Sequence, residues 1–395
     1  MKPNDFKPNT AGKVIRTKLD YWAFDPSLVE PEIEFDLQLV GTLSRADRAL
    51  SELAGIARTL PNPHLLIRPF MRREAVLSSR IEGTQASLSD LLFFEAASAG
   101  EPVLPDVREV ANYVRALEYG LARLSALPLS LRLIREVHER LMNGVRGETQ
   151  TPGEFRRSQN WIGPPGCTLM DATYVPPPVD EMQIALDRFE KYLHAESGLP
   201  PLVRMALIHY NFEAIHPFLD GNGRVGRLLI TLLMCADRLL PQPLLYLSAY
   251  FERHRDEYYQ LLQNVSQRGE WAPWIRFFLR AVEDQSRDAI KRSDTLLALW
   301  NSYRSRLQEA RASALLLRLV DELFSFPAIS TKIAAEVLNV TPRSAQLNIN
   351  KLIESGILIE ATGFRRNRVY VARAIVDAIE QGDSRVAPSP PAIQR

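Results

Sequence analysis

The chain has 395 residues, 46% of them hydrophobic, and its 48 Lys and Arg against 47 Asp and Glu give a net charge of +1. This length allows two or three domains, each with its own core. The balanced charge excludes a general electrostatic attraction to nucleic acids or anionic membranes. Two cysteines cannot form a disulfide framework and no apolar run is long enough to cross a bilayer, so we expect a cytoplasmic protein.

Helical periodicity dominates the chain between its two ends. The first 30 residues are predicted to be irregular, and a short β-hairpin interrupts the central helices. Near the C-terminus, three short helices are combined with two strand-like runs, Ile357–Glu360 and Val369–Val371. We therefore predict an all-α fold class with small β elements, in five segments: an N-terminal helical region, 1–110; a helical core, 111–285; a helical connector, 286–311; a small helix-and-strand domain, 312–375; and a disordered tail, 376–395.

The loop from His216 to Arg227 holds a histidine, a carboxylate, three glycines, an asparagine and two arginines. The helical pattern of Leu199–Ile215 must end before Pro217, and residues 228–240 are apolar nearly all round, as in a buried helix. Glycines free backbone N–H groups to surround an anion, the N-terminus of a helix attracts it, and arginine forks bind phosphate oxygens. The loop therefore predicts a phosphate site with a proton acceptor beside it.

Two other phosphate-binding patterns can be excluded. Residues 221–226 match G-x-G-x-x-G, but a helix precedes them rather than a strand. No acidic residue follows about twenty positions later, where a dinucleotide ribose would need one. The G-x-x-x-x-G-K-[ST] pattern of Walker-type NTPases is also absent from the sequence.

The stretch His216–Arg227 resembles the signature of the Fic family, H-x-F-x-[DE]-G-N-G-R-x-x-R, at every fixed position. The resemblance implies an all-helical fold and a protein adenylyltransferase, which transfers AMP from ATP to Ser, Thr or Tyr hydroxyls of target proteins and of itself. A branch of the family that transfers phosphate carries a lysine where this chain has Gly223. The glycine therefore favours nucleotidyl transfer.

The residue types agree with this chemistry. A hydroxyl side chain needs a base at neutral pH, and His216 is the candidate because the pKa of an unperturbed histidine lies near neutrality. Asp220 is the candidate ligand of Mg²⁺, which is often held by one carboxylate together with phosphate oxygens and waters; its alternative role is a helix N-cap. Phe218 is expected to anchor the loop in the core.

The remaining motif residues are expected to bind ATP. Asn222 and the amides of Gly221 and Gly223 would hold the α-phosphate, where charge develops during transfer. Arg224 and Arg227 would neutralise the β- and γ-phosphates. The predicted ATP-binding residues of the motif are Gly221, Asn222, Gly223, Arg224, Gly226 and Arg227.

Two segments outside the motif resemble further parts of Fic proteins. Residues 154–163 and 174–178 are similar to the family's flap, a hairpin over the active site whose edge can accept a target segment as an added strand, and Ile162, Gly163 and Thr173 are its candidate contacts. The alternative is an ordinary connecting loop. Residues 251–259 are similar to the adenine-pocket stretch, in which Tyr258 would flank the base or, alternatively, pack within a helix.

Residues 78–83 match the family's inhibitory motif, [ST]-x-x-x-E-[GN], in Ser78, Glu82 and Gly83. A carboxylate paired with Arg227 would occupy the arginine that should hold the γ-phosphate, and Gly83 suits a left-handed helix end. This predicts autoinhibition. The alternative is an ordinary helix end with a solvated face.

Residues 312–375 resemble a winged helix with Phe364–Arg368 at the wing tip. Such a domain could bind DNA through Arg343, Gln346 and Asn350, but seven Lys and Arg against five Asp and Glu over 312–372 make DNA binding a lesser expectation than partner docking. Three questions stay open: whether the chain removes AMP rather than adding it, whether it is a DNA-binding regulator, and whether it forms a homodimer.

Overall fold

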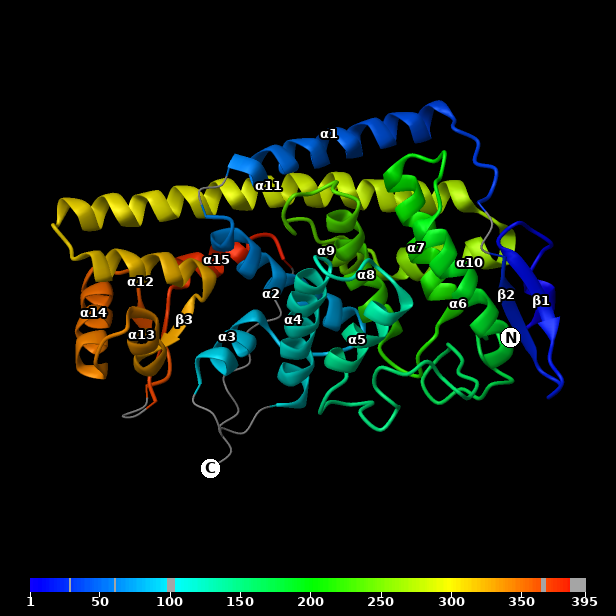
Figure 1. The fold of residues 1–395 in the computed structure, drawn as a ribbon, viewed down its shortest axis with the longest axis horizontal. Helices are drawn as coiled ribbons and strands as arrows, with labels where there is room; N and C mark the ends of the chain where they lie inside the picture. The colour runs from blue at the N-terminus through cyan, green and yellow to red at the C-terminus, as the bar shows by residue number, and fades with distance from the viewer. Residues whose placement is uncertain (28–29, 60–61, 98–103, 364–366, 384–395) are drawn as a thin grey trace.

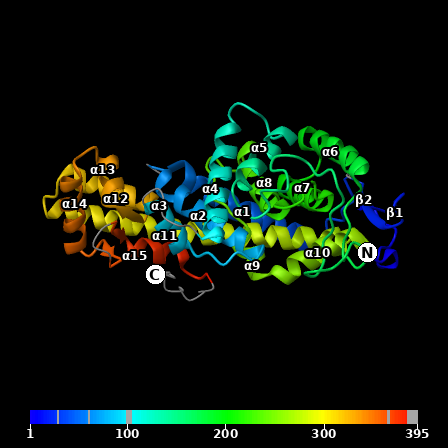
Figure 2. The same cartoon turned by 90° about the horizontal axis from the view of Figure 1, so that it is seen from below.

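The computed structural model describes residues 1–27, 30–59, 62–97, 104–363 and 367–383. Its longest element is α11 (Trp271–Glu309), which spans about 58 Å at 1.5 Å per residue. Helix α1 (Leu37–Thr59) lies along it in both views (Figures 1 and 2). The predicted connector, 286–311, is therefore the second half of one continuous helix rather than a separate segment.

Most of the remaining helices pack beneath this pair (Figure 1). Helix α8 is buried along nearly its whole length, as its apolar sequence predicts, and it contacts α2, α4, α5 and α7. This arrangement confirms the predicted all-α fold class. The helices of this part are α2 (His64–Ile81), α3 (Leu88–Ala96), α4 (Pro105–Arg123), α5 (Leu131–Leu141), α6 (Val179–His194), α7 (Pro201–Ile215), α8 (Asn222–Ala236), α9 (Ser248–Arg253) and α10 (Arg255–Arg268).

The prediction that the first 30 residues are irregular is wrong. A short 3-10 helix (Pro3–Asp5) is followed by an antiparallel pair, β1 (Gly12–Arg16) and β2 (Trp22–Pro26). The pair is stabilised from outside, because the N–H of Phe24 donates to the carbonyl of Val175 and the Phe24 ring is buried in the core. Since this partner lies 151 positions further on (175 − 24), local sequence could not reveal it.

The predicted flap contains no regular strand in the structure. A single bridge joins Ile162 to Tyr174. Prolines at 164–165 and 176–178 cannot donate to a ladder, which accounts for the short pairing. The segment is instead held by the buried Arg156, which donates to the carbonyl oxygens of His216, Ser158 and Pro177.

The C-terminal part follows the element order helix, strand, helix, helix, strand, strand. Its three strands form one antiparallel sheet in the order β3-β5-β4, and the first of them was not predicted. Residues 364–366 of the expected wing tip lie outside the described residues. The elements are α12 (Ala314–Ser325), β3 (Ala328–Ser330), α13 (Thr331–Leu338), α14 (Pro342–Glu354), β4 (Ile359–Glu360) and β5 (Val369–Val371).

The predicted disordered tail, 376–395, begins too early. Helix α15 (Arg373–Glu380) packs against α11 and α2, because Ile375, Val376 and Ile379 form one buried face. Beyond it, Asp383 forms an ion pair with Arg73 of α2 at 2.6 Å. Residues 384–395 lie outside the described part.

The helix-and-strand domain and the N-terminal β pair lie at opposite ends of the long axis (Figures 1 and 2). Within the described residues, no helix is both long and apolar enough to cross a membrane.

Candidate functional site

Two left-handed residues shape the motif loop. Helix α7 ends at His216 with φ 49° and ψ 60°, and Gly221 with φ 81° begins α8. Left-handed backbone turns the chain sharply, and it is uncommon for a residue with a side chain. The loop therefore needs only six residues, 216–221, between two packed helices, and the sequence predicted such a tight turn.

The side chain of Asn222 closes this loop. Its Oδ1 accepts from the N–H of Phe218 at 2.9 Å, and its Nδ2 donates to the carbonyl of Phe218 at 2.8 Å. The residue is buried and does not line the adjacent cavity. The amide expected at an α-phosphate is thus engaged with the backbone of the loop in this structure.

His138 of α5 also supports the loop, a role that the sequence did not indicate. Its Nδ1 accepts from the N–H of Gly153 at 2.8 Å, so the proton lies on Nε2, which donates to the carbonyl of Asp220 at 3.0 Å. Its ring stacks on that of Phe218 at 3.7 Å, and Phe218 itself is fully buried, as predicted. Burial lowers the pKa of His138 to about 4, which keeps the ring neutral.

A cavity of about 530 Å³ opens beside the loop. Residues from the inhibitory motif (78–83), the predicted flap, α7, α8 and α10 meet around it, although these segments are far apart in the sequence. Of the predicted site residues, those that line it are Glu82, Ile162, Gly163, Thr173, His216, Gly223, Arg227 and Tyr258.

His216 has the protonation state of a base. Its Nδ1 lies 3.4 Å from the carbonyl of Glu213, and an Nδ1–H donating there leaves Nε2 unprotonated. Burial lowers the pKa of His216 to about 4, and the charge of Arg156 adds to this effect. The imidazole is therefore neutral at physiological pH.

Arg227 is buried and is bound by the end of α2. Its Nε donates to Ser78 Oγ at 2.9 Å, and its Nη2 donates to the carbonyl of Ser78 at 2.9 Å and to Glu82 Oε1 at 2.7 Å. Burial alone would raise the pKa of Glu82, but the charge and hydrogen bond of Arg227 outweigh it and lower that pKa. Gly83 follows with φ 96°, the left-handed helix end that was predicted.

The two later glycines of the motif have different neighbours. Any side chain at Gly223 would collide with the Glu82 carboxylate and with Nη1 of Arg227, so the glycine makes room for their ion pair. Gly226 lies against Glu213 and Phe212 of α7, where a Cβ would also collide. Gly226 therefore permits close packing of α7 on α8 and, unlike the expectation, does not line the cavity; neither does Gly221.

Arg224 is placed differently from the expectation. It is fully buried, 3.3 Å from Glu109 and 3.4 Å from Asp220, and it does not line the cavity. Oδ1 of Asp220 accepts from the N–H of Gly221 at 2.6 Å, whereas no hydrogen bond involves Oδ2 in the described part of the chain. One free oxygen on a side chain that is 39% exposed suits Mg²⁺, which keeps several water ligands. No cluster of three His, Cys, Asp or Glu able to hold a metal occurs among the described residues.

Tyr258 is a buried residue with a fixed hydroxyl. It is 1% exposed, bonds His209 Nε2 at 2.8 Å and stacks on Phe251. Two further residues of the cavity were not predicted from the sequence. Tyr259 lines the same cavity and is 41% exposed. Glu213 also lines it; its Oε1 has no partner among the described residues, and burial raises its pKa to about 7.

In the C-terminal part, Gln346 is less free than a DNA contact requires. Its amide binds Thr331 Oγ1 at 2.7 Å, Asn350 Oδ1 at 2.8 Å and the hydroxyl of Tyr370 at 3.1 Å. The exposed face of α14 presents Leu347, which is 57% exposed, together with the exposed Arg343 and Asn350. An apolar side chain in that place is poorly suited to phosphate or base edges.

Comparison with known proteins agrees with this geometry. Residues 40–122 match the Fic/DOC family N-terminal model and residues 128–234 match the Fic/DOC family model. The chain is similar to protein adenylyltransferase Fic of Drosophila virilis, with 35% identity over 182 residues, 44% of this chain and 33% of that protein. It is also similar to protein adenylyltransferase Fic of Culex quinquefasciatus, with 35% identity over 211 residues, 51% of this chain and 38% of that protein. The match thus spans a little over a third of these relatives.

Two solved structures share the fold. A Fic family protein from Desulfovibrio desulfuricans aligns with a TM-score of 0.54 at 19% identity, over 87% of this chain and 98% of that one. Fic-1 from C. elegans aligns with a TM-score of 0.51 at 23% identity, over 65% of this chain and 74% of that one. Both domain models match in order, over residues 40–122 and 128–234, so this part of the chain is similar to the Fic/DOC family.

Proposed function

We propose that this chain is an autoinhibited protein adenylyltransferase that transfers AMP from ATP to a hydroxyl side chain. The observation that carries the proposal is that a neutral histidine, His216, and a buried arginine, Arg227, line one cavity. The similarity to the proteins named protein adenylyltransferase Fic in Drosophila virilis and Culex quinquefasciatus supports the same activity.

His216 acts as the general base in this proposal. Nε2 takes the proton of the target hydroxyl, whose oxygen attacks the α-phosphorus of ATP. The bond between the α-phosphorus and the oxygen that bridges to the β-phosphate then breaks, and pyrophosphate leaves. Asn222 and His138 hold the loop so that His216 keeps its orientation without touching substrate.

Arg227 binds the far phosphates, and the free Nη1 supports this role because it is a buried donor with no partner in the described residues. The side chain of Asp220 would hold Mg²⁺, which would offset charge on the phosphates. Asn222, Arg224 and Gly226 do not line the cavity and instead stabilise the loop and helix that carry the site. Ile162, Gly163 and Thr173 border the cavity, and we place the target segment along them.

Glu82 inhibits the reaction in this proposal. Its carboxylate is hydrogen-bonded to Arg227 and lies against Gly223. The guanidinium is therefore not available to the γ-phosphate of ATP, and the negative charge of Glu82 repels that phosphate. One second activity is favoured by the same contact. Because Glu82 and His216 line one cavity, they could position a water for hydrolysis of AMP from a modified protein.

The test uses ATP labelled at the α- or the γ-phosphorus, with the full chain carrying Glu82→Gly and with Glu82→Gly/His216→Ala. We expect protein-bound label only from α-labelled ATP and only with His216 present. Label from γ-labelled ATP would instead identify a kinase-like phosphate transfer. Loss of label from pre-modified protein on adding wild-type chain would establish the hydrolytic alternative.

We further propose that residues 314–371 form a winged helix that docks a protein partner rather than DNA, on the strength of the exposed Leu347 and the engaged Gln346. We also propose a cytoplasmic location, because Cys167 and Cys235 are both free. A homodimer stays an open proposal.

A further inference from the structure

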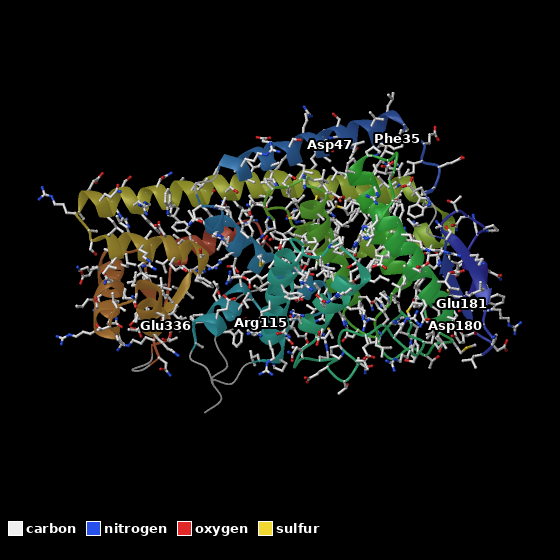
Figure 3. All side chains as sticks on the ribbon, viewed as in Figure 1. Phe35, Asp47, Arg115, Asp180, Glu181 and Glu336 are labelled. Atoms are coloured by element: carbon white, nitrogen blue, oxygen red, sulfur yellow. The ribbon has the colours of Figure 1, made fainter. Side chains whose placement is uncertain are left out.

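A second pocket, of about 390 Å³, lies between α4, α5 and the loop that follows α5. Three arginines line it: Arg108 and Arg115 on one face of α4, and Arg140 in the last turn of α5. It shares no lining residue with the catalytic cavity. Figure 3 labels Arg115, whose side chain extends from α4.

Each of the three guanidinium groups is held by a neutral acceptor. Nη1 of Arg108 donates to the carbonyl of Gly144 at 3.3 Å, and Nη1 of Arg115 donates to Asn112 Oδ1 at 3.3 Å. Nη1 of Arg140 donates to the carbonyl of Glu136 at 2.8 Å. These bonds orient the groups without neutralising their charge, and they leave further N–H donors in each fork.

Two acidic residues of the same helices are already paired with other arginines. Glu109 accepts from Arg224 and lies near Arg146, while Glu136 pairs with Arg123 and Arg132. Within the described ranges, no carboxylate forms an ion pair with Arg108, Arg115 or Arg140. Three like charges around one pocket repel each other, so the pocket is electrostatically incomplete.

The pocket is also built rigidly. Asn112 is buried and fully bonded, because its Nδ2 donates to the carbonyls of Leu141 and Asn143 at 3.2 and 2.6 Å while its Oδ1 holds Arg115. The guanidinium of Arg140 lies 3.3 Å from the ring centre of Tyr119, which restricts its rotation. A preorganised site loses less entropy on binding than flexible surface arginines would.

We propose that this pocket binds a small phosphate-bearing anion. Arginine forks match phosphate oxygens in pairs, and three of them suit a di- or triphosphate group, free or as part of a nucleotide. The neighbouring arginines of α5 do not line the pocket: Arg132 forms an ion pair with Glu136, and Arg135 donates to the carbonyl of Gly153.

The experiment titrates the full chain with tripolyphosphate and, separately, with ADP by calorimetry. Arg108→Gln and Arg115→Gln remove exposed residues, so the fold is retained; Arg132→Gln is a matched exposed arginine outside the pocket. We expect each pocket substitution to weaken binding by about tenfold or more, since charged hydrogen bonds are lost. Arg132→Gln should leave the affinity nearly unchanged.

Preference for tripolyphosphate or for ADP would decide between a free polyphosphate and a nucleotide, and either supports the site. Binding that survives Arg108→Gln and Arg115→Gln, or that disappears in Arg227→Ala, would overturn the proposal and assign the anion to the catalytic cavity. Tighter binding of a glutamate-rich peptide than of tripolyphosphate at equal ionic strength would overturn it in favour of a protein partner. The proposal is independent of AMP transfer, because no outcome depends on turnover.

Discussion

The carboxylate of Glu82 lies 2.7 Å from Nη2 of Arg227, across 145 positions of sequence. The two residues come from the end of α2 and the first turns of α8, and Ser78, one helical turn before Glu82, binds the same guanidinium. The end of α2 therefore binds Arg227 through two residues four positions apart, Ser78 and Glu82, which lie on one helix face. Any shift of α2 along its axis would change both contacts together, so the state of this arginine depends on how α2 is held.

Glu82→Gly should raise AMP transfer onto target proteins and onto the chain itself. The substitution frees Arg227 for the γ-phosphate and removes a repelling charge. Without nucleotide it should also lower the melting temperature, because a buried guanidinium loses its counter-ion. Mg-ATP should restore the melting temperature by binding the folded state. Label incorporation from α-labelled ATP and thermal melting measure both effects.

Arg227→Ala is the control for this prediction, because it removes both the ion pair with Glu82 and the proposed phosphate ligand. We expect it to be inactive. If Glu82→Gly incorporates no more label than the wild type, the Glu82–Arg227 pair is structural and not inhibitory.

His216→Ala, in the Glu82→Gly background, should reduce transfer by about 10²–10⁴-fold, the usual cost of losing a positioned base. Binding of ATP should change little, since the base acts on the hydroxyl. His194→Ala, at an exposed histidine of α6, is the control and should have no effect. Single-turnover rates and nucleotide affinity separate the two steps, and near-normal turnover of His216→Ala would assign the base elsewhere.

The ascending limb of the pH–rate profile should lie at acidic pH, well below pH 6. Burial holds the pKa of His216 at about 4, so the neutral, basic form is present throughout pH 6–8. Between these values kcat/KM should therefore not show the sigmoidal rise of a histidine with an ordinary pKa near 6.5. A profile that rises through pH 6.5 would contradict the assignment of a desolvated base.

Asp220→Ala should lose activity and its dependence on Mg²⁺ together, because Asp220 lies on the motif loop and its Oδ2 has no hydrogen-bond partner among the described residues. Asp187→Ala removes an exposed carboxylate paired with Lys191 and serves as the matched control. The measurement is the rate as a function of Mg²⁺ concentration. Activity that still titrates normally with Mg²⁺ would place the metal at other ligands.

Asn222→Ala should destabilise the chain by about 1–3 kcal/mol, because the N–H and carbonyl of Phe218 both lose a partner in a buried place. Activity should fall with it through misplacement of His216. Denaturant unfolding gives the stability, and the melting curve of the nucleotide-bound form tests whether substrate recovers it. A fully stable but inactive variant would show instead that the amide contacts the phosphate directly.

Glu213→Gln should flatten part of the pH dependence of stability. Burial raises the folded pKa of Glu213 to about 7 from its ordinary value of 4.5, so its contribution to stability is complete below pH 4.5 and is lost as the pH rises to 7. The wild type should therefore lose stability between pH 4.5 and pH 7, and the variant should lose less. The remaining slope is assigned to Glu74, whose pKa is also raised to about 7 by burial. Equal slopes in both proteins would contradict the protonated state of Glu213.

The features that the sequence alone determined are local ones. Pro217 ends α7, Gly221 permits the left-handed start of α8, and Gly83 ends α2, because each depends on the backbone preferences of one or two residues. Continuous apolar sequence predicted that α8 is buried. The twelve residues of the motif are contiguous, so their pattern was enough to place the loop and to indicate phosphate chemistry.

Only the tertiary structure decided which of these residues face the cavity. Asn222 and Arg224 both have side chains that could bind phosphate. In the structure Asn222 binds the backbone of Phe218, and Arg224 pairs with Glu109. Glu109 lies 115 positions before Arg224, and a partner that distant cannot be predicted from residue type. The β1–β2 pair depends in the same way on Val175. His138 and Tyr259 join the site because helices distant in sequence pack against one loop, and packing, unlike helix termini, is set by the whole chain. Glu213 lies only three residues before His216, but the burial that raises its pKa also comes from the packed helices.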